Sequence, residues 1–209
     1  MLKRFLLLMA LPVVAALVGC AHPISLTADT APLMGLGTGQ KVDRTAVLVM
    51  TEAQLAQEVV SPGGGGDKVS YKPYKDMQSG LYVALNEVFA QTRVATSLND
   101  PRVGNDPATL VVIPTITTTS YSPSLFTWPP TIFTITVELS LTDAGRTTPS
   151  AKVRAQGEGR AEFDEFKSDF SLSSKRAAQD VLTKLINALQ AQADNVRRWT
   201  TTQAEQPAH

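Results

Sequence analysis

The chain has 209 residues, with 19 basic and 19 acidic side chains that leave no formal net charge. No basic field favours nucleic acid or an anionic membrane surface, and no nucleic-acid partner is expected. The single cysteine excludes an intramolecular disulfide, so the core alone must hold the fold, and the length suits one domain.

Residues 1–19 have the pattern of a secretory signal peptide. Lys3 and Arg4 precede an apolar run from Phe5 to Val18. A membrane-spanning helix needs about 20 apolar residues, and Pro12 interrupts this shorter run. Removing the segment takes away two basic residues and leaves a slightly acidic mature chain.

Cys20 ends the sequence Leu17-Val18-Gly19-Cys20. This tetrapeptide resembles the lipobox of bacterial lipoproteins, in which the signal is cut before the cysteine and the cysteine is acylated. The resemblance implies a protein anchored to a membrane by lipid at Cys20. In that family an aspartate after the cysteine retains the protein in the inner membrane. Ala21 stands there instead, which implies the outer membrane, facing the periplasm.

Residues 20–44 are rich in Pro, Thr, Gly and Ala, which is typical of a flexible tether after the lipid. A glycine segment at 35–39 lacks the strand and helix that a nucleotide-binding loop requires.

Residues 45–50 predict a strand buried on both faces. Four glycines at 63–66 predict a flexible loop without the Lys-Ser/Thr of a phosphate-binding loop.

The next segments predict a helix followed by short strands. Apolar residues recur at helical spacing from Tyr74 to about Gln91, with Gly80 as a weak point. A short strand is expected around 93–98 and a turn region around 99–107. Residues 109–121 predict a strand, with Pro114 indicating an edge position or a bulge.

The segment 120–130 joins two predicted strands but carries aromatic side chains and two prolines. We expect either that its aromatic residues cap the core or that an exposed tip meets a partner or a membrane interface. In the second interpretation, Pro129 and Pro130 stiffen the tip. The candidate contact residues are Tyr121, Phe126, Trp128, Pro129 and Pro130.

Strict alternation of apolar and polar residues predicts two long antiparallel strands, over 133–142 and 151–164. Gly157 and Gly159 face inward in this pattern, so either a helix packs closely there or the strand bends. A long helix is expected from Ser173 to about Arg197. The polar residues 199–209 predict a disordered tail.

These elements predict one α+β domain over 45–198. We expect two layers: a mostly antiparallel meander sheet with two helices on one face. With the lipobox, this layout resembles YajG-like lipoproteins, the lipopolysaccharide-assembly lipoprotein and the Pel-polysaccharide export lipoprotein. The resemblance implies a non-enzymatic accessory protein of the envelope, with an envelope protein or a second copy as partner. It transfers no individual functional residue.

The sequence offers few groups for catalysis. Its two histidines are His22, in the expected tether, and His209, the last residue, and its one cysteine is the expected lipid site. We therefore expect no catalytic residue, no metal and no cofactor. The alternative is a periplasmic glycan hydrolase that uses two carboxylates from the group Glu158, Glu162, Asp164 and Glu165. Ion pairing of these residues on an exposed strand is the favoured interpretation.

Overall fold

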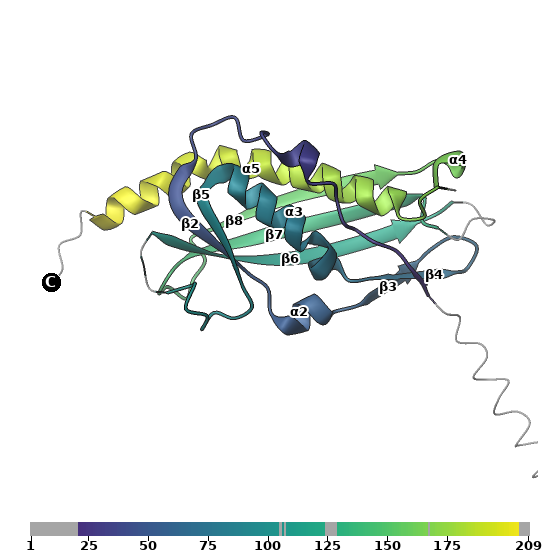
Figure 1. Cartoon of the computed structure of the whole chain (residues 1–209), viewed down its shortest axis with the longest axis horizontal. Coiled ribbons are helices and arrows are strands. Elements are labelled where there is room, and N and C mark those ends of the chain that lie inside the picture. The colour runs from purple at the N-terminus through teal and green to yellow at the C-terminus, as the bar shows by residue number, and fades with distance from the viewer. Residues whose placement is uncertain (1–20, 105, 107, 124–128, 167, 205–209) are drawn as a thin grey trace, which may run out of the picture.

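The computed structural model describes residues 21–104, 106, 108–123, 129–166 and 168–204. Two β-sheets and several helices form an α+β fold (Figure 1). The elements are β1 (His22–Pro23), η1 (Ala31–Leu33), β2 (Val42–Val49), α2 (Glu52–Ala56), β3 (Val59–Pro62), β4 (Lys68–Tyr71), α3 (Pro73–Val88), β5 (Phe89–Ala95), β6 (Thr109–Tyr121), β7 (Ile132–Asp143), β8 (Ala151–Arg160), α4 (Phe163–Phe166) and α5 (Leu172–Ala204).

The sheets are mixed, which corrects the expected antiparallel meander. The larger sheet has the order β5-β2-β6-β7-β8, and β2 runs parallel to both of its neighbours. β2 and β5 can pair in parallel because α3, which directly precedes β5, returns the chain to the end of the sheet at which β2 begins. Two parallel neighbours always need such a crossover connection. Among the described strands of this sheet, β6, β7 and β8 form the predicted antiparallel meander. A smaller sheet has the order β1-β4-β3.

The alternating pattern correctly predicted the two long strands, and the apolar run over 45–50 correctly predicted a strand that is buried on both faces. Along β7, every second residue from Phe133 to Leu141 is buried in the main core. In β2, Ala46 and Leu48 join that core, whereas Val47 and Val49 lie in a second cluster on the other face. β8 ends at Arg160, and α4 begins at Phe163, so the second long strand is shorter than expected.

Helices α3 and α5 cover one face of the larger sheet, as predicted (Figure 1). The inward glycines of β8 permit a close approach of α5. A Cβ added to Gly157 would lie 2.7 Å from the Cβ of Val181, and one added to Gly159 would lie 2.8 Å from that of Arg176. Gly80 plays the same role in α3, where an added Cβ would collide with Leu182. Close packing, rather than a bend, therefore explains these glycines.

The predicted flexible tether is wrong for the residues after β1. Leu26 and Leu33 have no exposed surface, and they belong to the main core with Ile24 and Ala28. Burial of these side chains stabilises the segment against the body of the protein. Residues 199–204 of the predicted tail belong to α5, which continues to Ala204, and residues 205–209 lie outside the described residues. Within the described part of the chain, no helix is both long and apolar enough to cross a membrane.

Candidate functional site

An open groove of about 620 Å³ lies between the β3–β4 hairpin and the end of β6. Its walls include Val60, Lys68 and Tyr121, and the turn over 63–67 forms one side. Val60 and Tyr121 are 55% and 59% exposed, and both line this one groove. We call this part of the molecule the groove end.

Polar contacts fix the hairpin to β6. The hydroxyls of Ser61 and Ser120 lie 2.7 Å apart, and those of Tyr71 and Thr118 are also 2.7 Å apart. The ring of Tyr71 packs edge-on against Phe133, with 5.3 Å between ring centroids. The groove therefore has walls that are held in place by buried aromatic packing and by side-chain hydrogen bonds.

The glycine run closes the hairpin rather than forming the expected flexible loop. The Gly63 N–H donates to the Asp67 carbonyl at 2.9 Å, and the Asp67 N–H donates to the Gly64 carbonyl at 3.1 Å. Gly65 and Gly66 have φ angles of 65° and 88°, which glycine adopts without strain. These backbone angles explain why the turn is built of glycine.

The start of the described chain lies beside the groove. β1 pairs in parallel with β4, and His22 stands opposite Val69. The His22 Nε2 atom is 3.8 Å from a carboxylate oxygen of Asp67, in the hairpin turn. His22 is therefore part of the folded body, which corrects its expected place in a tether.

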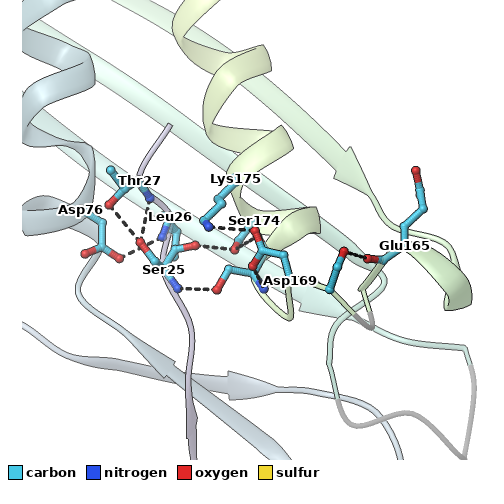
Figure 2. A network of polar contacts seen from close by, with 10 residues as sticks. Ser25, Leu26, Thr27, Asp76, Glu165, Asp169, Ser174 and Lys175 are labelled. Atoms are coloured by element: carbon cyan, nitrogen blue, oxygen red, sulfur yellow. Dashed lines mark hydrogen bonds and ion pairs between the residues drawn. The ribbon is translucent and has the colours of Figure 1, made fainter. Parts of the chain in front are cut away.

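A network of hydrogen bonds fastens the next residues to both long helices (Figure 2). The Ser25 N–H donates to the Ser171 hydroxyl at 3.0 Å, and the Ser174 hydroxyl donates to the Ser25 carbonyl at 2.7 Å. The Leu26 N–H donates to the Asp76 carboxylate at 2.9 Å. Burial raises the pKa of Asp76, although this N–H bond acts in the opposite direction. The path of the chain from β1 to the core is thus fixed.

The structure divides the predicted contact residues. Tyr121 is exposed and lines the groove, so its role in contact stays a prediction. Pro129 and Pro130 are buried, and the Pro130 carbonyl accepts a hydrogen bond from the buried Ser173 hydroxyl at 2.5 Å. They are therefore anchors at the base of the segment and not contact residues. Phe126 and Trp128 lie outside the described residues.

Sequence reasoning missed Val60 and the pairing of β1. The adjacent β-branched residues Val59 and Val60, just before Pro62 and the glycines, were the available signal for a hairpin strand. A two-residue strand such as β1 has no periodicity to detect.

Two of the four acidic residues considered for glycan hydrolysis form ion pairs, one on the exposed face of β8, as predicted, and one between α4 and α5. Glu158 is 2.8 Å from Arg160, and Glu165 is 2.8 Å from Arg176. The hydrogen bonds from Arg176 lower the pKa of Glu165 to about 2. Among the described residues, no group of three or more His, Cys, Asp or Glu side chains could hold a metal ion.

The second glycine segment, at 35–39, faces a carboxylate. The N–H groups of Gly35 and Gly37 both donate to the same oxygen of Glu87, each at 2.9 Å. These donors hold the chain against α3.

No family model and no curated protein matches the chain. Among solved structures, it is similar to protein XCC0632 from Xanthomonas campestris, of the DUF330 family, at 12% identity and a TM-score of 0.47, over 85% of this chain and 99% of that one. It is also similar to the hypothetical protein CT253 from Chlamydia trachomatis (9% identity, TM-score 0.38, 71% and 99% coverage). A third similar structure is a Caulobacter crescentus protein provisionally described as a lipoprotein (14% identity, TM-score 0.35, 77% and 96% coverage).

Proposed function

We propose that this chain is a lipoprotein anchored at Cys20 to the outer membrane, where it faces the periplasm and acts as a non-enzymatic binding or assembly module. The motif Leu17-Val18-Gly19-Cys20, after an apolar run of export-signal length, supports the anchor and the cleavage point. Ala21 supports the outer membrane through the sorting rule of the family that the motif resembles.

The observation that carries the proposal is the fixed position of His22 beside an exposed groove. Only Ala21 separates His22 from Cys20 in the sequence, so the two Cα atoms are at most about 7 Å apart. His22 is held on β4, and β4 is half of the hairpin that forms the groove. An acyl group on Cys20 would therefore hold the groove end close to the membrane.

The non-enzymatic part of the proposal rests on the side chains that the sequence provides. Acylation would occupy the only cysteine, and His22 is the only histidine before the last residue. The exposed Val60 and Tyr121 are suited to contact rather than to proton transfer. The proposed partner of the assembly is an envelope protein or a second copy of the chain.

Metabolic labelling with a radioactive fatty acid tests the anchor. The wild-type chain should incorporate label and fractionate with the outer membrane, whereas Cys20→Ser should remain unlabelled. The matched variant Ala21→Asp should keep the label but shift to the inner membrane. An unlabelled wild-type chain would overturn the anchor, and an unchanged location of Ala21→Asp would overturn the sorting argument.

Capture from detergent-solubilised envelope tests the binding role. The acylated protein should retain a defined partner, or a second copy of itself, after cross-linking. Release of reducing sugar from an envelope glycan by the purified protein would instead favour the hydrolase alternative.

A further inference from the structure

The groove end combines an exposed apolar surface with the attachment point of the chain. Val60 and Tyr121 come from segments far apart in the sequence, yet they line one groove. The small sheet fixes the first described residues beside that groove. In Figure 1, β3, β4 and the purple start of the chain lie at the right, whereas the yellow end of α5 lies at the left.

From this juxtaposition we propose that the groove end is a membrane-contact surface, which rests against the lipid headgroups of the bilayer that holds the acylated Cys20. The inference rests on the proposed anchor and adds the orientation of the domain. Val60 and Tyr121 would enter the headgroup region of the bilayer, and the glycine turn would lie along the surface of that region. The opposite end of β6 would point away from the membrane.

The length of the connection favours a lipid surface over other occupants. Since Cys20 is two residues before the fixed His22, the domain cannot move far from the bilayer or present an arbitrary face to it. Because the connection is short, the groove end stays at a high effective concentration beside the bilayer, and its contact with lipid needs no separate binding from solution. Weak contacts by a few side chains are then sufficient to set the orientation.

The chemistry of the surface suits a headgroup region. Tyrosine is enriched at membrane–water interfaces because its ring is apolar and its hydroxyl is polar. The charged residues of the groove, Lys68 and Asp67, have opposite signs, and Asp67 also faces His22. We therefore expect the contact to depend little on anionic lipid or on salt concentration.

Fluorescent labelling of the full chain, processed and acylated in bacteria, tests the surface. After acylation of Cys20, the variants Val60→Cys and Tyr121→Cys each provide one thiol at the groove end. Thr148→Cys is the matched control, because residue 148 is exposed in the turn after β7, at the far end of β6. Each labelled protein is reconstituted into vesicles of phosphatidylethanolamine and phosphatidylglycerol, and mass spectrometry of the same preparation reports the acyl chains.

We expect blue-shifted emission and several-fold stronger quenching by nitroxide-labelled lipid at residues 60 and 121 than at residue 148. Equal exposure to water of all three positions in an acylated protein would overturn the membrane contact and leave the anchor intact. A blue shift without quenching by the nitroxide lipid would show that protein covers the groove, and would also overturn it. Absence of acyl chains at Cys20 would overturn the anchor and the orientation together.

Discussion

Single residues determine how closely the two layers of this fold approach each other. Gly159 lies so near the start of α5 that an added Cβ would collide with the Ser173 carbonyl. Gly159→Ala should therefore lower the free energy of unfolding by about 2 kcal/mol, because the helix must shift to make room. Gly39→Ala, where no atom of the described residues lies within 4 Å of the added Cβ, should change the free energy of unfolding by less than about 0.5 kcal/mol. Urea denaturation of both variants measures the difference, and equal stabilities would contradict close packing.

The buried ion pair between Arg44 and Asp143 is a second residue-scale feature. Their charged atoms are 2.7 Å apart, and the two side chains are 1% and 5% exposed. Asp143→Ala would leave a buried guanidinium without its carboxylate, so the free energy of unfolding should fall by about 3–5 kcal/mol. The exposed pair of Glu138 and Lys152 provides the control, since Glu138→Ala should cause little measurable change. Thermal unfolding of the two variants checks this, and similar losses would contradict it.

The pair of Glu165 and Arg176 predicts an effect of acid. The pKa of Glu165 is about 2 in the folded chain, against an ordinary value of 4.5. Its contribution to stability is present above the ordinary value and is lost as the pH falls from about 4.5 through about 2. Glu165→Gln should therefore flatten the dependence of unfolding on pH in this window. NMR titration of the carboxyl would contradict the pair if it gave an ordinary pKa.

At the scale of elements, the segment after β1 behaves as part of the core and not as a linker. Leu26→Ala should destabilise the protein by about 2–5 kcal/mol, because Leu26 is completely buried. Met34→Ala, in the same segment but 62% exposed, should have almost no effect. Hydrogen exchange offers a second measurement, in which the Leu26 amide should be protected by Asp76. If the segment were a tether, both substitutions would leave the free energy of unfolding unchanged, and the Leu26 amide would exchange rapidly with solvent.

Sequence patterns predicted the long elements of this fold but not the segment after β1. Strict alternation predicted β7 and β8, and helical spacing predicted α3 and α5, because each has one apolar face over many residues. The residues Ile24, Leu26 and Ala28 also alternate, but over so short a stretch that Pro, Thr and Gly dominated the interpretation. Pairing of β1 with β4 depends on a contact across the fold, which no local pattern reports.

The candidate site was predictable only in part, because contacts between distant segments decide which of its residues are exposed. Tyr121 was identified from its aromatic and proline-rich surroundings, and it is exposed at the groove. Pro129 and Pro130 were assigned to the same exposed tip, but both are buried in the folded chain. Val60 becomes part of the site only because the hydroxyls of Ser61 and Tyr71 bind the hairpin to β6.

At the scale of the whole molecule, the fold has two distinct ends. β6 runs from the end that holds the turn after β7 to the groove end over 13 residues, a distance of about 40 Å. A domain held at its groove end would therefore present the opposite end about 40 Å from the lipid headgroups. In this orientation the turn after β7 lies at the end of the domain that is far from the bilayer.

The length of the connection to Cys20 should control this orientation. Inserting about twelve Gly and Ser residues after Ala21 lengthens it from two residues to about fourteen, which should lower the effective concentration of the groove end at the bilayer by about 20-fold. Because contact through Val60 and Tyr121 is weak, quenching by nitroxide lipid at residue 60 should fall toward the value at residue 148. The acyl chains and the stability of the domain should be unchanged, since β1 still pairs with β4. Full quenching at residue 60 in the lengthened chain would show that the surface binds lipid without the short connection, and would contradict its role in setting the orientation.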